Sequence, residues 1–107
     1  MALQAFEISL ELIRSLEQPL ATLDRRDTDL AKQLRRAAAS VSLNLSEGNR
    51  RHGKDRIHLW RVAAGSADEV AASLRVAEAF GYLQAASSVQ SLALCDRVLA
   101  MLWRLTH

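Results

Sequence analysis

Apolar side chains recur every three or four residues along most of this chain, the spacing that gathers them on one side of an α-helix. The first such run, which contains Phe6 and Leu10, predicts a helix from about Leu3 to Leu16. Pro19 then ends or bends this helix, because proline has no backbone N–H to donate. We expect residues 20–26 to form a connection.

A second helix is expected to begin at Asp27 or Thr28, either of which can accept the free amides of a first helical turn, and to run to about Glu47. At 100° per residue its positions sort into three faces. The apolar face consists of Leu30, Leu34, Ala38, Val41 and Leu45. A polar line at the same spacing consists of Gln33, Arg36, Ser40, Asn44 and Glu47. The face of small side chains, Ala39, Ser42 and Ser46, either admits another backbone, such as that of a neighbouring subunit, or faces solvent.

Gly48 is expected to close the second helix in the left-handed conformation, and a basic loop from Asn49 to Lys54 follows. The third helix should run from about Asp55 to Phe80 and end in the same way at Gly81. Its length, near 38 Å if straight, suggests that its start protrudes and carries the basic loop with it. Its apolar stripe comprises Leu59, Trp60, Ala63, Ala67, Val70, Leu74 and Ala77.

The last helix is expected to be capped by Ser87 or Ser88 and to run to about Leu105. Its main stripe is predicted to be Val89, Leu92, Leu99 and Leu102. Further apolar residues indicate either central burial or contact between subunits: Leu94, Val98, Met101, Trp103 and Leu105. Four such helices with short connections predict an all-α fold, an antiparallel up-down four-helix bundle.

Length and composition limit the classes of protein to which this chain can belong. A chain of 107 residues suits a single domain, here residues 1–107. Half of the residues are hydrophobic, yet no apolar run approaches the ~18 to 20 residues that span a bilayer. No basic segment followed by an apolar block marks a signal peptide, so we expect a cytoplasmic protein without a membrane partner. The single cysteine, Cys95, falls among apolar residues and is expected to act as a small buried hydrophobe.

Charge is unevenly distributed along the sequence. Between Lys32 and Arg61, eight basic residues stand against two acidic ones, so this segment carries +6. The remainder, with six basic and ten acidic residues, carries −4. Twelve of the fourteen basic residues are arginine, which binds phosphate through two parallel hydrogen bonds. The asymmetry favours sequence-independent attraction to nucleic acid.

The basic residues permit two interpretations. Arg35 and Arg36 either pair with acidic residues of adjacent helices or subunits, or contact a ligand. The cations of the loop either contact a ligand or are merely solvated. The candidate nucleic-acid-binding residues are Arg35, Arg50, Arg51, Lys54 and Arg56.

Patterns that would indicate catalysis are missing from the sequence. His52 and His58 stand six residues apart, without the i, i+4 pairing or the carboxylate companions of a helical metal site. The sequence has no Glu-x-x-His motif and no Gly-rich phosphate loop, and Cys95 has no nearby histidine to activate it. We therefore expect no enzymatic activity, metal, cofactor or small-molecule substrate.

Four stretches, taken in order, resemble a known family. They are Gln33-Leu34-Arg35-Arg36-Ala37-Ala38, Asn44-Leu45-Ser46-Glu47-Gly48 with Arg50-Arg51, Ala64-Gly65-Ser66-Ala67-Asp68-Glu69, and Phe80-Gly81-Tyr82-Leu83. The set covers essentially the whole chain. It is similar to the small four-helix bundle proteins encoded within intervening sequences of bacterial large-subunit ribosomal RNA, a family that includes accessory proteins of diversity-generating retroelements. Ser42 stands where the family often has proline, which leaves the subfamily open.

The resemblance implies a ring-like homopentamer, and the retroelement relatives bind a reverse transcriptase and nucleic acid through basic surfaces. It also implies a structural motif that organises the bundle, formed by Gln33, Arg36, Asn44, Glu47, Gly48 and Glu69. The leading hypothesis is a non-catalytic, homopentameric scaffold that grips the phosphates of RNA or DNA without reading bases. One alternative is an adaptor that docks a partner protein, such as a reverse transcriptase, without touching nucleic acid. A plain structural oligomer is the third reading.

Overall fold

The computed structural model describes residues 2–107, and within that range it contains five α-helices and no strand. The all-α prediction is confirmed, but the number of helices is five rather than four. The helices are α1 (Ala2–Ser15), α2 (Glu17–Arg26), α3 (Thr28–Asn49), α4 (Gly53–Ala79) and α5 (Ala85–Thr106).

The extra helix is α2, and it replaces the connection that the sequence predicted for residues 20–26. Pro19 bends the chain rather than ending the helical region. It occupies the third position of α2, in the first turn, where a missing N–H leaves no intrahelical bond unmade. The side chains of Pro19 and Leu23 are buried, so packing stabilises a segment that is too short, at 10 residues, to form a stable helix alone.

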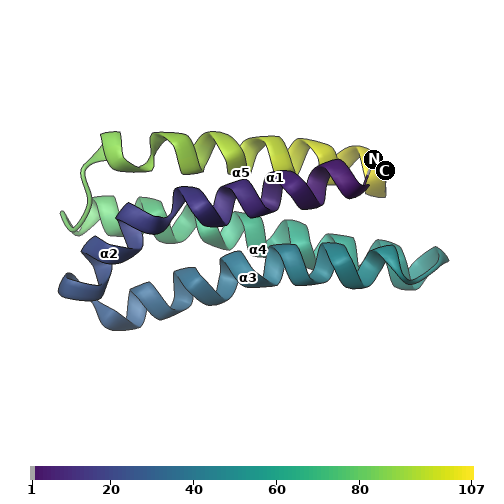
Figure 1. The fold of residues 1–107 in the computed structure, drawn as a ribbon, viewed down its shortest axis with the longest axis horizontal. Coiled ribbons are helices and arrows are strands. Elements are labelled where there is room, and N and C mark those ends of the chain that lie inside the picture. The colour runs from purple at the N-terminus through teal and green to yellow at the C-terminus, as the bar shows by residue number, and fades with distance from the viewer. Residues whose placement is uncertain (1) are drawn as a thin grey trace.

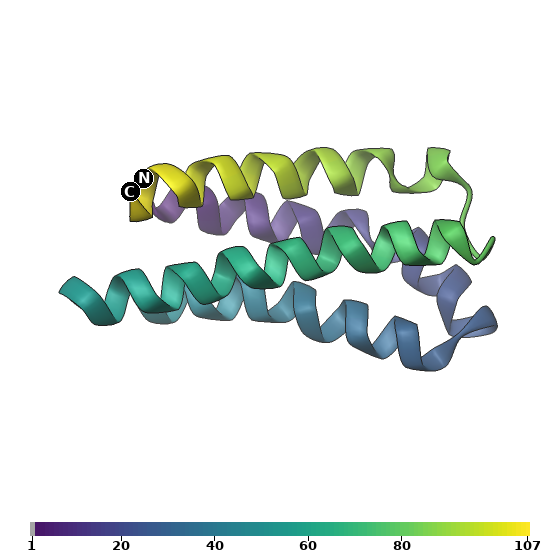
Figure 2. The same cartoon turned by 180° about the vertical axis from the view of Figure 1, so that it is seen from behind.

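The four long helices pack side by side in up-down order, with α2 extending the bundle where α1 passes into α3 (Figures 1 and 2). Helix α3 packs against α1 and α4, and α5 packs against α1 and α4. The turn between α3 and α4 extends beyond the neighbouring ends of α1 and α5, as the length of the third predicted helix suggested (Figure 1). The molecule is therefore a rod, 42 × 22 × 19 Å, with the basic turn at one tip.

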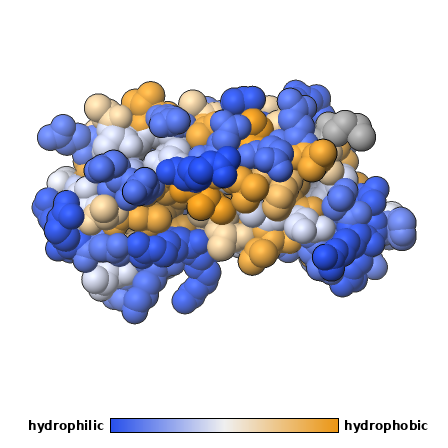
Figure 3. Space-filling view, viewed as in Figure 1, coloured by the Kyte–Doolittle hydropathy of each residue, from blue (hydrophilic) through white to orange (hydrophobic). Residues whose placement is uncertain are grey.

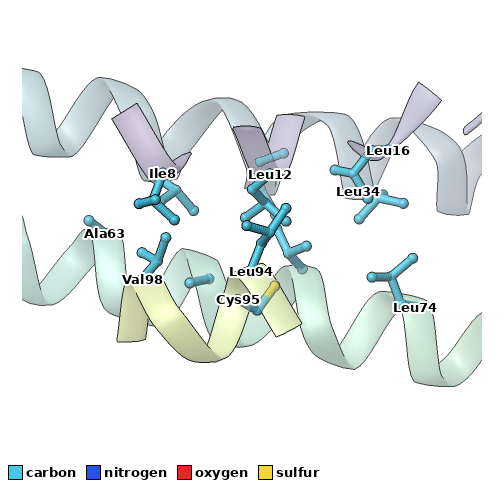
Figure 4. Close-up of a cluster of buried hydrophobic side chains, with 14 of the residues drawn as sticks. Ile8, Leu12, Leu16, Leu34, Ala63, Leu74, Leu94, Cys95 and Val98 are labelled. Atoms are coloured by element: carbon cyan, nitrogen blue, oxygen red, sulfur yellow. The ribbon is translucent and has the colours of Figure 1, made fainter. Parts of the chain in front are cut away.

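The core is built from the inner faces of all five helices, and Figure 4 shows its middle layers. The predicted apolar face of α3 is entirely buried, and so is the α4 stripe, apart from Leu59, which is half-buried. Cys95 is buried as predicted. Burial raises the pKa of its thiol to about 12, and the charges of Asp96 and Asp68 act in the same direction. The thiol therefore stays protonated at neutral pH.

The inner face of α5 contains Leu102 of the predicted main stripe, and the central burial expected as one alternative for Leu94, Val98 and Met101 is confirmed, but the rest of the face differs from the prediction. Val89 is 62% exposed, whereas the buried positions are Ser88, Ser91, Leu94, Cys95, Val98, Met101, Leu102 and Thr106. The inner face begins with serines, and the Ser91 hydroxyl lies 2.7 Å from the Ser15 hydroxyl of α1. Small side chains let α1 and α5 approach closely there. The stripe predicted from hydrophobicity alone therefore lies closer to the solvent side of the helix than the true inner face does.

We expect Val98→Ala to lower the free energy of unfolding by about 2 kcal/mol, because it removes two methyl groups from a fully buried site and leaves a cavity. Val89→Ala makes the same chemical change on the same helix at an exposed position, and it should change stability by less than about 0.5 kcal/mol. Urea unfolding of both variants checks this difference. A larger loss for Val89→Ala would contradict the assigned face of α5.

Some helix ends agree with those predicted from the sequence, and others do not. Asp27 caps α3, since its Oδ1 accepts from the Leu30 amide at 3.0 Å, and Gly81 ends the α4 region at φ 78°. Neither Ser87 nor Ser88 caps α5, which begins at Ala85 after Gln84. Gly48 does not end α3 either: it is buried within the last turns of the helix, and its φ is not positive. The basic loop is correspondingly short, because α4 begins at Gly53.

Candidate nucleic-acid interface

The tip of the rod is held together by the contact between Gly48 of α3 and Trp60 of α4. Trp60 is 5% exposed, and its indole N–H donates to the Leu45 carbonyl at 3.3 Å. A Cβ atom at Gly48 would lie 2.5 Å from the indole nitrogen of Trp60. Glycine is therefore required at position 48 by close approach of the two helices and not by a left-handed turn.

Arg56 of α4 also stabilises the turn, through contacts with the end of α3 and with Trp60. Its Nε donates to the Gly48 carbonyl and its Nη2 to the Asn49 carbonyl, each at 3.1 Å, and its guanidinium lies 5.3 Å from the centre of the Trp60 ring. These carbonyls belong to the last turn of α3, where intrahelical donors run out. Arg56 was predicted to bind nucleic acid, and the structure places it as a clamp across the base of the turn.

The three other predicted cations of the tip differ in their surroundings. Arg51 pairs with Glu47, at 2.8 Å between Nη2 and Oε2, and both side chains are about half exposed. Arg50 and Lys54 are exposed, and neither makes an ion pair or a side-chain hydrogen bond with any residue from 2 to 107. Arg50 and Lys54 thus carry charge that nothing in the described chain neutralises. Figure 3 shows hydrophilic side chains gathered at this end of α3 and α4.

Arg35 does not belong to the tip. It donates to both carboxylate oxygens of Asp24 in α2, at 3.0 and 2.6 Å. The hydrogen bond from Arg35 lowers the pKa of Asp24, and the same bond raises the pKa of Arg35. Fifteen helical residues separate Arg35 from Arg50, about 22 Å along the axis. The basic segment of the sequence therefore divides between the two ends of the rod instead of forming one patch.

The residues of the proposed structural motif lie in several settings. The Asn44 amide donates to the Ser40 carbonyl at 2.9 Å and to its hydroxyl at 3.0 Å, and that hydroxyl lies 2.8 Å from the Ser66 hydroxyl of α4. This part of the polar line does connect two helices. Other members of the motif, namely Gln33, Arg36 and Glu69, are exposed and make no side-chain hydrogen bond within residues 2–107.

The face of small residues on α3 admits another backbone at one position and faces solvent at the others, so both expected roles are present. Ser42 is buried, with its hydroxyl 2.8 Å from the Ser9 hydroxyl, so α1 of the same chain is the backbone that approaches. Further along this side, Ala39 and Ser46 are exposed, and Leu43 is 67% exposed. An apolar surface consequently runs between α1 and α3 (Figure 3).

An open hollow of about 770 Å³ lies beside the tip, between the start of α4 and the end of α5. Its walls include Lys54, His58 and Arg61 from one side of α4, together with Ile57 and, from α5, Leu105. Sequence reasoning missed His58 and Arg61 as site residues. Their spacing from Lys54, at i+4 and i+7, was the available signal, since it places all three on one helix face.

Residues 2–107 bring together no group of three or more histidine, cysteine or acidic side chains that could hold a metal ion. Within the same range, no helix combines the length and the apolar character needed to cross a membrane.

Comparisons with known proteins agree with this fold. Residues 1–104 match the family described as 23S rRNA-intervening sequence protein. A crystal structure from Bacteroides thetaiotaomicron, described as a protein of unknown function from the S23 ribosomal protein family, superposes with a TM-score of 0.85. The alignment covers 95% of this chain and 97% of that one at 18% sequence identity, a likeness that concerns the fold. No curated protein sequence matches the chain.

Proposed function

Because the chain belongs to the 23S rRNA-intervening sequence protein family, we propose that it is a non-catalytic, homo-oligomeric scaffold that binds nucleic acid through its α3–α4 tip. One observation carries the proposal: Arg50 and Lys54 project from a clamped turn with no acidic partner among residues 2–107. Phosphate groups are the abundant anions that such side chains attract regardless of base sequence.

The rigidity of the tip supports this role. Trp60 and Arg56 tie the turn to both helices, so little conformational freedom remains to be lost when a ligand is bound. Each tip supplies only a few cations, which give weak binding alone. Several tips in one ring would act together and raise the overall affinity without new contacts. The resemblance to ring-forming proteins makes the pentamer our proposed assembly, and the exposed apolar surface between α1 and α3 is available for subunit contacts.

We expect the double charge reversal Arg50→Glu with Lys54→Glu to weaken binding to a mixed-sequence RNA duplex by roughly tenfold or more at about 100 mM salt. The slope of log affinity against log salt should become shallower by about 2, since two phosphate contacts are lost. Fluorescence anisotropy over a salt series measures both quantities.

The matched control is Arg14→Glu with Arg75→Glu, which changes the net charge equally at two exposed arginines away from the tip. It should reduce affinity far less and leave the slope nearly unchanged. Equal losses in the two double variants would show that overall charge, and not the tip, governs binding. Light scattering on the same samples reports the number of subunits.

A second function has one observation in its favour. Large apolar side chains remain exposed on several helices, among them Leu43, Phe80, Val89 and Trp103, each more than 60% exposed. An adaptor that docks a partner protein would use such a surface. Recovery of a stoichiometric protein partner after nuclease treatment, with no affinity of the purified chain for RNA, would favour the adaptor over the scaffold.

A further inference from the structure

The hollow between α4 and α5 combines two chemical characters. Its rim carries the cationic side chain of Lys54, the imidazole of His58 and the guanidinium of Arg61, spread over about 10 Å of the α4 axis. Its floor is apolar, with half-buried Ile57 and Leu105 and the little of Trp60 that reaches the surface. None of the acidic residues within positions 2–107 lines it.

One side chain of the rim, Arg61, is positioned before any ligand arrives. Arg61 donates through Nη2 to the Thr106 carbonyl at 3.2 Å, which fixes the guanidinium across the end of α5 and leaves further N–H groups to donate. The hollow also includes Gly53 and Lys54, the first two residues of α4, where free backbone amides and the helix dipole favour an anion.

We propose that this hollow binds an unpaired nucleotide of a single-stranded segment, with the base against Ile57 and Leu105 and the phosphates on Lys54, His58 and Arg61. The inference rests on the proposed function and deepens it, because Lys54 belongs to both the tip and the hollow. A strand with an unpaired end would fill the hollow, whereas a duplex would contact the tip without filling it.

The chemistry of the hollow favours this occupant. A phosphate ion alone would leave the apolar floor exposed to water. A base within a duplex is stacked between its neighbours, so its faces are not free to cover that floor. An unpaired nucleotide offers a flat apolar face next to a charged phosphate, so it can cover the aliphatic floor while its phosphate contacts the rim. An acidic peptide would also suit the charge of the rim, and equal affinity for strands with and without bases is the result expected of a hollow that recognises acidic charge alone.

Comparison of oligothymidylate with an abasic oligodeoxynucleotide of equal length tests the proposal, since the two strands carry the same phosphates and differ only in the bases. The protein should bind oligothymidylate roughly tenfold more tightly, because the base removes the apolar floor from water. Ile57→Asp should bring this ratio close to one, because a carboxylate then occupies the floor. Ile57 is half-buried and lies outside the set of residues packed on the core, so the variant is expected to fold.

Val89→Asp is the matched control, with the same added charge at an exposed position of α5, and it should keep the wild-type ratio. Equal affinity of the wild-type protein for the two strands would overturn the inference while leaving the proposed function standing, and this measurement needs no variant. Absence of binding to either strand would also overturn the inference, and it would remove the proposed function only if the mixed-sequence RNA duplex failed to bind as well. A ratio that survives Ile57→Asp, or that is lost equally in Val89→Asp, would place the base elsewhere and overturn the assignment.

Discussion

Gly48→Ala should lower the free energy of unfolding by about 1 to 3 kcal/mol, although alanine is the better helix former. The new methyl group would lie 2.5 and 2.6 Å from two atoms of the Trp60 indole, which is itself buried and cannot move aside freely. The overpacking exceeds the gain of about 1 kcal/mol in helix propensity. Urea denaturation followed by circular dichroism measures the change.

Gly65→Ala is the control that isolates the clash. Gly65 also lies within a helix, its surroundings are open, and a Cβ atom there would meet nothing within 4 Å. The substitution should therefore raise stability by about 0.5 to 1 kcal/mol. Opposite signs for the same substitution at two helical glycines are the expected result. Stabilisation by both would show that Trp60 does not press on Gly48.

The second large effect concerns the two tryptophans. Trp60→Ala should cost about 3 to 5 kcal/mol, because it empties a buried aromatic site and leaves the Gly48 backbone without its partner. Such a loss is a large part of the 5 to 15 kcal/mol that stabilise a typical domain. Arg56 also loses the ring beneath it, so amide exchange in the α3–α4 turn should accelerate beyond the global change.

Trp103→Ala provides the comparison. Trp103 is 62% exposed and, within residues 2–107, its ring stacks only on His107, with the ring centres 3.4 Å apart, so its removal should change stability by less than about 1 kcal/mol. Thermal and urea unfolding of both variants measure these two changes in stability. Similar losses for the two tryptophans would contradict the distinct environments that the structure assigns to them.

These expectations share a physical basis, which is that the tip of the rod is held by Arg56 and Trp60 and not by the exposed cations Arg50 and Lys54. Arg56 and Trp60 hold the turn, whereas Arg50 and Lys54 do not contribute to holding it. Stability and nucleic-acid affinity should therefore respond to different substitutions. Removing Arg50 and Lys54 should weaken binding while the unfolding curve stays in place.

Several features of the fold followed from periodicity alone. The faces of α3 and α4 were predicted well because each is a continuous run of leucine, alanine and valine at helical spacing, and buried stripes of this kind need no knowledge of the partner. The cap at Asp27 and the end at Gly81 depend on local backbone chemistry, so they too could be recognised in the sequence.

The candidate site was foreseen less completely. The sequence singled out the cations of the tip, but it could not distinguish Arg56, which bonds two carbonyls, from Lys54, which is free among the described residues. Arg35 was grouped with them because it is close in sequence. Its distance from the tip is a consequence of the helix that separates them.

The sequence by itself determined that this chain is helical, which faces of α3 and α4 are apolar, and that its basic residues cluster between Lys32 and Arg61. Those properties depend on composition and on spacings of three or four residues. Tertiary structure alone decided that Pro19 lies within the first turn of a helix, that α5 turns serines inward, and that Gly48 makes room for Trp60. Each of these depends on how closely two helices approach, a distance that is fixed by side chains from both partners and is not encoded in either segment alone.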